Sequence, residues 1–249
     1  MLATYQTLIL AAGMGQRLKP ITLTIPKCLA PVLGRPLLEY WLFLLDKGPS
    51  PSRIWVNTSY LAEQVEFFLS NAKATYKNLS LTVTFEPKLL GTAGTLRYLS
   101  SEFSEQQDLL LTHADNLSWF DLNAFLTAHR LRPRSTEITM MIFESDSPKT
   151  CGIVELNEFD ILEAFHEKVE NPPSNLANGA TYLISPAGLA KILALGNVVD
   201  FSTEVIPAFL GKIYCWKNST YHRDIGSPLS YTVAQEEFKL VADKFQLGN

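Results

Sequence analysis

Cysteine and histidine are scarce in this sequence of 249 residues. It contains three cysteines, Cys28, Cys151 and Cys215, and four histidines. Because the cysteines are far apart, odd in number and never spaced as Cys-x-x-Cys, they predict neither a disulfide framework nor a zinc site. A reducing compartment is the simplest expectation from this cysteine content.

Long apolar runs and clusters of positive charge are also lacking. The most apolar stretch covers residues 36–45, which is far shorter than the ~20 residues of a membrane span. The N-terminus has no basic segment followed by an apolar core, so we expect no signal peptide and a cytoplasmic location. The basic residues are scattered and the net charge is −4, which gives no reason to expect a nucleic-acid or membrane partner.

Apolar residues make up 47% of the chain and alternate between short continuous runs and helical spacing. The continuous runs predict strands at residues 7–11, 53–57, 79–85, 108–113 and 138–143. Pro36, which suits a first helical turn, and Gly48, which suits a C-terminal cap, predict a helix at residues 37–47. Helical spacing predicts further helices at residues 60–69, 95–99 and 121–129. Strands of this kind, alternating with helices, are typical of a parallel sheet covered on both faces. We therefore expect a doubly wound α/β fold. The helix at residues 37–47 is apolar nearly all round, which predicts burial against a sheet or in contact with another subunit.

The second half of the chain is more mixed. Its apolar runs predict a strand pair at residues 152–156 and 160–165 and a further strand at residues 180–184. They also predict a helix at residues 186–195. A last helix is expected to follow Ser227 as N-cap, with Pro228 in its first position. Its apolar stripe would be Ala234, Phe238, Val241 and Phe245. No linker or repeat divides the sequence, so we expect one continuous domain over residues 1–249.

The stretch LILAAGMGQRLKPITLTIPK, residues 8–27, ends a predicted strand in a glycine-rich turn. Ligands of open α/β folds bind at the carboxyl edge of the sheet, so this turn is a candidate phosphate site. A dinucleotide-binding turn is disfavoured because Leu18 stands where its third glycine belongs and Pro20 opposes an ordinary helix. The Gly-Lys-Ser/Thr ending of a P-loop is missing. We expect a loop that stays extended and delivers the cations Arg17 and Lys27 to a polyphosphate.

Further segments follow this motif in an informative order. They are LAAGMGQRLKPITLTIPKCLAPVLGRPLLEY (10–40), FEPKLLGTAGTL (85–96), LLLTHADN (109–116), CGIVEL (151–156), FHEK (165–168), ANGATYLI (177–184), DFSTEVIP (200–207) and HRDIGSPLSY (222–231). Through them the sequence resembles the sugar-1-phosphate nucleotidyltransferases, the enzymes that make nucleotide sugars. The resemblance implies a Rossmann-like fold with a mixed, mostly parallel sheet. It also implies that residues 1–130 mainly bind nucleotide and residues 131–249 mainly bind sugar phosphate.

The implied reaction joins a nucleoside triphosphate to a sugar 1-phosphate and releases pyrophosphate, for a cell-surface polysaccharide or another glycan. It needs no protein nucleophile, so positioning and charge neutralisation carry the catalysis. The implied cofactor is Mg²⁺, which prefers carboxylate and phosphate oxygens. The aspartates that match the metal-binding positions of the family are Asp115 and Asp224. Together with Arg17 and Lys27 they form the implied catalytic set.

Other roles are implied position by position. The implied nucleotide-binding residues are Ala12, Gly13, Gly15, Arg17, Lys27, Glu86, Gly91, Thr92 and Gly94. The implied sugar-phosphate-binding residues are Gly152, Glu167, Lys168 and Asn178. Among these, Lys168 would meet the phosphate, while Glu167 and Asn178 would meet hydroxyl groups.

The segment LLGTAGTL, residues 89–96, is most similar to guanylyltransferases that act on mannose or manno-heptose phosphates. It favours GTP with mannose 1-phosphate or D-glycero-α-D-manno-heptose 1-phosphate. A uridylyl-, cytidylyl- or thymidylyltransferase acting on another sugar is the alternative. The order Asn-Gly-Ala at residues 178–180 reverses the usual Asn-Ala-Gly, and Cys151 stands where an aromatic residue is common. The oligomeric state is left open, a homodimer included.

Simpler interpretations compete with the functional ones. The glycine pair after the first strand can be a structural turn, and Asp115 and Asp224 can be N-cap or turn residues. Glu167 and Lys168 can form a solvated surface pair. The histidines have no partner at ligand spacing; only His222, two positions before Asp224, is placed to approach a metal.

Two other functions are weighed against catalysis. A non-catalytic binding or regulatory member of the family would be favoured by loss of Arg17, Lys27 or either aspartate, and all four are present. A nicotinamide-dependent oxidoreductase is disfavoured by Leu18 and Pro20. The active enzyme is therefore the preferred prediction.

Overall fold

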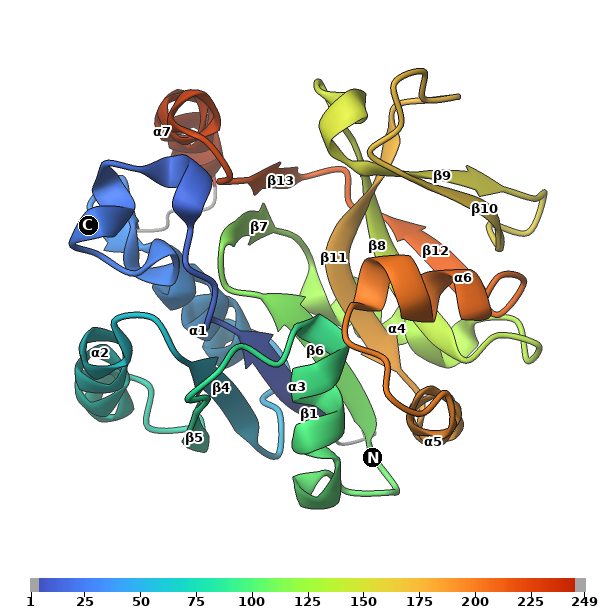
Figure 1. Cartoon of the computed structure of the whole chain (residues 1–249), viewed down its shortest axis with the longest axis horizontal. Coiled ribbons are helices and arrows are strands. Elements are labelled where there is room, and N and C mark those ends of the chain that lie inside the picture. Colours follow the sequence, from blue (N-terminus) through green and yellow to red (C-terminus); the bar gives the residue numbers. More distant parts are fainter. Residues whose placement is uncertain (1–4, 245–249) are drawn as a thin grey trace. The chain divides into compact units, whose positions relative to one another are not determined.

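The computed structural model describes residues 5–244 and divides them into two compact units. Unit 1 contains residues 5–8, 90–112 and 123–218, and unit 2 contains residues 9–89, 113–122 and 219–244. Two strands, β1 (Tyr5–Leu10) and β6 (Asp108–His113), begin in unit 1 and end in unit 2. Both strands are labelled in Figure 1. Each unit therefore gathers segments that are far apart in the sequence.

Unit 1 is organised around the strand β11 (Leu176–Ile184). This strand pairs antiparallel with β6, with β8 (Ile138–Glu144) and with β9 (Gly152–Leu156). β9 also pairs antiparallel with β10 (Leu162–Glu167), and β8 pairs parallel with β12 (Ile213–Lys217). The predicted strand pair is confirmed, and the sheet is mixed. Its strands are continuous apolar runs because side chains such as Leu110, Met140 and Leu183 are completely buried.

The helices of unit 1 are short. They are α3 (Thr92–Tyr98), α4 (Leu122–Leu131, with Leu122 in unit 2), α5 (Pro186–Ala194) and α6 (Ile206–Ala208), the last preceded by a π-helical turn at Phe201–Val205. The helix predicted at residues 186–195 is confirmed as α5. Its N-terminus is fixed by Ser185, whose Oγ accepts the backbone N–H of Gly188 at 3.1 Å.

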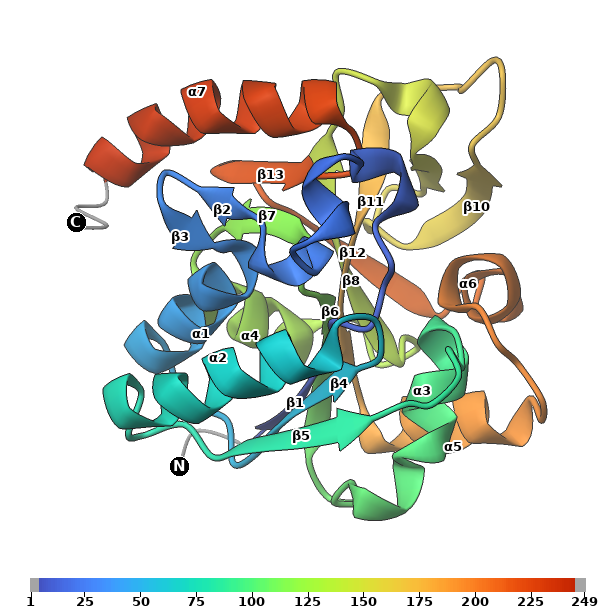
Figure 2. The ribbon, with the colours of Figure 1, turned by 60° about the vertical axis from the view of Figure 1, so that its left-hand side comes forward.

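Unit 2 contains the first crossover of the chain. β4 (Ile54–Thr58) pairs parallel with β5 (Leu81–Phe85), and α2 (Ala62–Thr75) connects them. Figure 2 shows α2 running beside these two strands. The parallel strands confirm the predicted alternation of strand and helix, and the α/β fold class is confirmed with it.

Two small strand pairs and two helices complete unit 2. β7 (Asn116–Trp119) pairs antiparallel with β13 (Tyr221–Asp224), and β2 (Pro31–Val32) with β3 (Arg35–Pro36). The helix α1 (Leu37–Lys47) has the predicted bounds, and most of its side chains are buried within the chain. Its Trp41 donates from Nε1 to the backbone oxygen of Asn116 at 3.0 Å. Most of the apolar surface of α1 is thus already covered.

The last helix, α7 (Pro228–Lys244), begins where the sequence predicts. Ala234 and Phe238 of the predicted stripe are buried, and Val241 is half-buried. Phe245 lies outside the described residues. The helix lies along β13 and β2 (Figure 2), where Gln235 Nε2 donates to the backbone oxygen of Pro31 at 2.8 Å.

The loop after β1 differs from its prediction. It contains no α-helix, as expected, but it is not extended, because it folds into three 3₁₀ turns at Gln16–Leu18, Ile21–Leu23 and Lys27–Leu29. The reversal starts at Gly15, whose φ of 60° lies in the left-handed region that favours glycine. Leu18 is then completely buried, which holds the first turn against the body of unit 2.

Other features of the described residues bear on the expectations from composition. Cys28, Cys151 and Cys215 are free thiols. Among residues 5–244, none of the helices has the length and apolarity that a bilayer crossing requires. The compartment itself stays a prediction.

Candidate active site

Three of the four residues in the implied catalytic set meet at one ammonium group in unit 2. Lys27 Nζ lies 2.5 Å from Asp115 Oδ2 and 3.3 Å from Asp224 Oδ1. Lys27 opens a 3₁₀ turn, Asp115 follows β6, and Asp224 ends β13. The fold therefore brings together side chains separated by 88 and 197 positions. We call Arg17, Lys27, Asp115 and Asp224 the cation–carboxylate cluster.

Arg17 belongs to this cluster less tightly. Its Nη2 lies 3.7 Å from Asp224 Oδ2, and 68% of its side chain is exposed, against 8% for Lys27. An exposed ion pair at this distance contributes little to stability. Arg17 is thus an exposed positive charge at the edge of the cluster, whereas Lys27 is buried inside it.

The charges in the cluster shift one another's titration. Burial alone would lower the pKa of Lys27, but the carboxylates of Asp115 and Asp224 outweigh it and raise that pKa above its usual value. Burial alone would raise the pKa of Asp115, but the charges of Lys27 and His113 outweigh it and lower that pKa. Both groups are therefore charged at neutral pH.

Backbone geometry explains why these side chains converge. The register of β7 and β13 places Asp224 opposite Asn116, the residue after Asp115. A Cβ on Gly226 would lie 2.6 Å from Asp224 Oδ2, and a Cβ on Gly15 would lie 2.9 Å from Lys27 Cβ. Glycine at these two positions leaves the space that the side chains of Asp224 and Lys27 occupy.

The glycine-rich turn itself is open at one point. Ala12 is buried, whereas a Cβ added to Gly13 would have no heavy atom of another part of the chain within 4 Å. This backbone can be approached closely from outside, as a phosphate-binding turn requires. The nucleotide-binding role of Ala12, Gly13 and Gly15 remains a prediction.

Glu86 has a defined position in the same unit. It is buried, and its Oε1 accepts a hydrogen bond from Asn57 Nδ2 at 2.9 Å. Asn57 Oδ1 in turn accepts the backbone N–H of Ala11 at 2.6 Å. Asn57 thus links the predicted base-side residue to the start of the glycine-rich turn, a connection that the sequence did not predict.

The segment GTAGT lies in unit 1 and has structural contacts of its own. The backbone N–H groups of Ala93 and Gly94, in the first turn of α3, donate to the oxygen of Val199 at 2.9 and 3.1 Å. The hydroxyl oxygen of Thr92 accepts the N–H of Phe201 at 2.7 Å. Gly91 has a φ of 81°, and a Cβ there would lie 2.6 Å from Val199 O. Thr92, Ala93 and Gly94 therefore hold the chain around 199–201, and the lack of a side chain at Gly91 allows the close approach of Val199. Nucleotide binding by Gly91, Thr92 and Gly94 stays a prediction.

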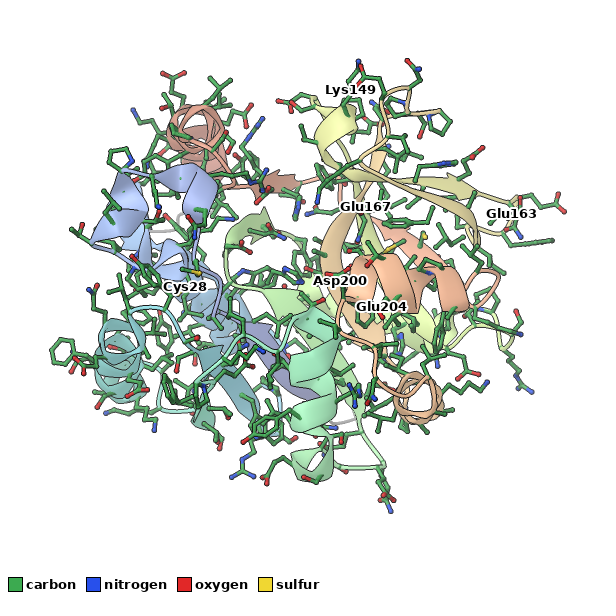
Figure 3. All side chains as sticks on the ribbon, viewed as in Figure 1. Cys28, Lys149, Glu163, Glu167, Asp200 and Glu204 are labelled. Carbon is green, nitrogen blue, oxygen red and sulfur yellow. The ribbon has the colours of Figure 1, made fainter. Side chains whose placement is uncertain are left out.

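Three predicted sugar-phosphate residues are adjacent in unit 1. Gly152 is paired with Glu167 across β9 and β10, and Lys168 follows Glu167 in the chain. Lys168 Nζ lies 2.8 Å from Glu167 Oε1, and a Cβ on Gly152 would lie 2.7 Å from Glu167 Oε2. The pair is an exposed lysine on a largely covered carboxylate, and phosphate binding by Lys168 stays a prediction. Figure 3 labels Glu167, and Asp200 from the turn before α6.

The fourth, Asn178, lies on β11 and is held at both ends of its amide. Its Oδ1 accepts the N–H of Ala180 at 2.9 Å, and its Nδ2 donates to the hydroxyl of Tyr182 at 2.7 Å. The charge of Glu167 acts on that same hydroxyl. Tyr182 is thus a second residue that sequence reasoning missed, although it stands inside the segment ANGATYLI.

The metal prediction rests on two carboxylates. Within residues 5–243, no three His, Cys, Asp or Glu side chains are grouped as metal ligands. His222 Nδ1 is hydrogen bonded to Ser118 Oγ at 2.6 Å, and burial, with Arg223, lowers the pKa of its ring to about 3. Asp115 and Asp224 supply hard oxygen donors that share one cation, which is a donor set that suits Mg²⁺ when phosphate oxygens complete it.

Comparison with known proteins places the chain in a family. The family described as Nucleotidyl transferase matches residues 6–239. The chain belongs to this family. The membership confirms the resemblance found in the sequence and covers both units.

Three relatives of this nucleotidyl transferase illustrate the likeness. Mannose-1-phosphate guanylyltransferase of Mycobacterium tuberculosis is 29% identical over 233 residues, which are 91% of this chain and 63% of the relative. D-glycero-alpha-D-manno-heptose 1-phosphate guanylyltransferase of Aneurinibacillus thermoaerophilus is 25% identical over 94% of this chain and 98% of the relative. The crystal structure of HddC from Yersinia pseudotuberculosis complexed with GMP-PN is 22% identical, with a TM-score of 0.72 over 94% of this chain and 100% of that one.

The last likeness concerns the fold alone. The chain spans about 60% of the length of the curated mannose-1-phosphate guanylyltransferases that it matches first.

Proposed function

We propose that this nucleotidyl transferase moves a nucleoside monophosphate from a nucleoside triphosphate to a sugar 1-phosphate and releases pyrophosphate. The observation that carries the proposal is the single ammonium of Lys27 between the carboxylates of Asp115 and Asp224. GTP and mannose 1-phosphate, or D-glycero-α-D-manno-heptose 1-phosphate, are the proposed substrates. The names of the guanylyltransferase relatives support this choice.

The proposed chemistry is an in-line displacement. A phosphate oxygen of the sugar 1-phosphate forms a bond to the α-phosphorus, and the bond between that phosphorus and the bridging oxygen to the β-phosphate breaks. No proton and no protein nucleophile is needed. The protein contributes by neutralising negative charge, with Lys27 as the fixed cation and Arg17 as the exposed one. In unit 1, Lys168 supplies the positive charge for the sugar phosphate.

A divalent cation fits the same cluster. Asp115 and Asp224 would hold Mg²⁺, and their two carboxylates already share one cation in the structure. When bound, the ion would neutralise phosphate charge and orient the triphosphate. The role of Lys27 is then to hold the two carboxylates together while the triphosphate is absent and to offer its ammonium to a phosphate oxygen.

The test is pyrophosphate release with Mg²⁺, measured for GTP, UTP, CTP, ATP and dTTP against a panel of sugar 1-phosphates. We expect turnover with GTP and a manno-configured sugar. The variants Asp115→Asn and Asp224→Asn should lose on the order of 10²-fold or more in turnover, since each removes a carboxylate that would hold Mg²⁺ at the reacting phosphates. Asp243→Asn, an exposed aspartate near the end of α7, is the matched control and should be unaffected.

The other outcomes decide between the remaining alternatives. Turnover with another base and sugar would keep the reaction and discard the guanine preference. No turnover in any combination, with nucleotide binding still measurable, would favour the non-catalytic member of the family and contradict the proposed reaction.

A further inference from the structure

Tyr182 places a polar group in the core of unit 1. Its residue is 1% exposed, and its ring packs on Phe201 with centroids 4.4 Å apart. Burying a hydroxyl group is unfavourable unless it is hydrogen bonded, so the position of this oxygen needs a reason beyond packing. A phenylalanine would fill the same space without that cost.

The hydroxyl of Tyr182 is bonded on two sides. It accepts the amide N–H of Asn178 at 2.7 Å, and it is hydrogen bonded to the side chain of Ser202. Ser202 belongs to the π-helical turn at Phe201–Val205. Burial, together with the nearby carboxylates of Glu167 and Asp200, raises the pKa of Tyr182, so the hydroxyl stays protonated.

The hydrogen bond to Asn178 exists because β11 is irregular at this point. Residues four apart on a regular strand are about 13 Å apart. The register of β11 against β8 shifts between Asn178 and Tyr182, and Ala180 has a φ of 48°. This bulge shortens the strand locally and brings the amide of Asn178 onto the tyrosine hydroxyl.

The amide of Asn178 is therefore fixed in one orientation. Its oxygen faces the N–H of Ala180 and its nitrogen faces Tyr182, so a flip would turn the amide N–H groups against the N–H of Ala180 and lose that hydrogen bond. One N–H and one oxygen lone pair remain for a ligand. A sugar hydroxyl both donates and accepts a hydrogen bond, and a pre-oriented amide meets it at a lower entropic cost than a free one.

We propose that Tyr182 is a positioning residue that, with Ser202, fixes the side-chain amide of Asn178 for a hydroxyl group of the sugar 1-phosphate. The inference rests on the proposed function. Tyr182 itself does not touch the substrate. Its effect on the reaction passes entirely through Asn178 and concerns the sugar and not the nucleotide.

The test is the variant Tyr182→Phe, which removes only the hydroxyl. The KM for mannose 1-phosphate, or for the sugar 1-phosphate that turns over in the grid above, should rise about tenfold, while kcat and the KM for GTP stay within about twofold. Tyr214→Phe, on β12 of the same unit, is the matched control and should change neither KM. A parallel change in kcat and both KM values would indicate a general structural role and overturn the proposal.

A double-mutant cycle with Asn178→Ala tests the route of the effect. If Tyr182 acts through Asn178, Tyr182→Phe should add nothing to the sugar KM once Asn178 is alanine. A tenfold rise in that background as well would overturn the inference. Ser202→Ala, which removes the other partner of the hydroxyl, should also raise the sugar KM, by a smaller factor. If Tyr182→Phe does not fold, Ser202→Ala tests the inference in its place, and an unchanged sugar KM would overturn it.

A measurement without substrate separates this inference from the proposed function. The side-chain amide signals of Asn178 in a ¹⁵N–¹H spectrum, assigned by their loss in Asn178→Ala, should shift in Tyr182→Phe and not in Tyr214→Phe. Unmoved signals would overturn the inference even in an active enzyme. A wild-type protein that turns over no substrate pair would overturn the proposed function, and the inference with it.

Discussion

The cation–carboxylate cluster of unit 2 and the Asn178–Tyr182 pair of unit 1 are held by different forces. In the cluster, full charges of opposite sign meet at 2.5 and 3.3 Å and shift each other's pKa values. In the pair, neutral groups meet at 2.7 Å across a strand bulge. Coulombic attraction is strong but weakly directional, whereas neutral hydrogen bonds fix an orientation. Under the proposed function, the charges of the cluster would meet phosphate, and the oriented amide of the pair would meet a sugar hydroxyl.

The largest effect is expected when the fixed cation of the cluster is removed. Lys27→Met should lower pyrophosphate release on the order of 10³-fold, because two carboxylates are left together and the phosphates lose a positive charge. Turnover at saturating substrate measures this. Lys149→Met breaks the exposed pair with Glu170 (2.5 Å; Lys149 is labelled in Figure 3) and is the matched control. Equal losses in both variants would contradict the special place of Lys27.

A second prediction compares two glycines, one from each predicted binding region. A Cβ on Gly152 would press on the ring of Phe165 and lie 2.7 Å from Glu167 Oε2, whereas a Cβ on Gly13 would meet nothing within 4 Å. Gly152→Ala should therefore lower the free energy of unfolding by about 1–3 kcal/mol, and Gly13→Ala by less than about 0.5 kcal/mol. Urea denaturation measures both. Gly13→Ala should instead raise the KM for GTP, and equal stability losses would contradict the comparison.

The dependence of stability on pH should differ between the cation–carboxylate cluster and the Asn178–Tyr182 pair. The pKa of Asp115 is lower in the folded protein than its ordinary value of about 3.9. Its contribution to the free energy of unfolding is therefore present above about pH 3.9 and is lost as the pH falls through the pKa of the folded protein. The pKa of Lys27 is higher in the folded protein than its ordinary value of about 10.4. Its contribution to the free energy of unfolding is therefore present below about pH 10.4 and is lost as the pH rises through the pKa of the folded protein.

In metal-free protein, the difference in unfolding free energy between wild type and Lys27→Met should therefore be largest between about pH 4 and 10 and smaller at either extreme. The corresponding difference for Tyr182→Phe should be flat over this range, because Tyr182 stays neutral and Asn178 does not titrate. Denaturation curves at a series of pH values with a chelator present would reveal the two profiles. A flat profile for Lys27→Met would contradict the charged interpretation of the cluster.

The smallest expected effect concerns the bulge that supports the pair. Ala180 has a φ of 48°, which is costly for alanine and not for glycine. Ala180→Gly should therefore raise the free energy of unfolding by about 1 kcal/mol. Asp160→Gly, at a φ of 57° in the turn between β9 and β10, is a control for relief of strain remote from Asn178. A loss of stability in Ala180→Gly would show that alanine is not strained there.

Much of the fold could be predicted from the sequence. Continuous apolar runs identified β4, β6 and β8, because burial on both faces leaves a clear pattern, and Pro36 and Gly48 gave the bounds of α1. The short strands β7 and β13 were missed. Their partners are about a hundred residues apart, and four residues carry too weak a periodic signal.

The candidate site was predictable in a different way. The identities of Lys27, Asp115 and Asp224 came from motifs, and the structure adds that one ammonium contacts both carboxylates. Asn57 and Tyr182 gave no such signal. A buried asparagine or tyrosine in a strand looks like an ordinary core residue until its hydrogen-bond partners are known.

By itself the sequence determined the family, the class of fold and the identities of the charged residues, because apolar period and motif order are local properties of a chain. Only the tertiary structure decided the convergence of Lys27 with Asp115 and Asp224, and the bulge that sets Asn178 against Tyr182. The convergence depends on strand register, and the bulge depends on a residue, Ala180, whose backbone is in the left-handed conformation. Both are settled by contacts between segments distant in sequence, which no local pattern encodes.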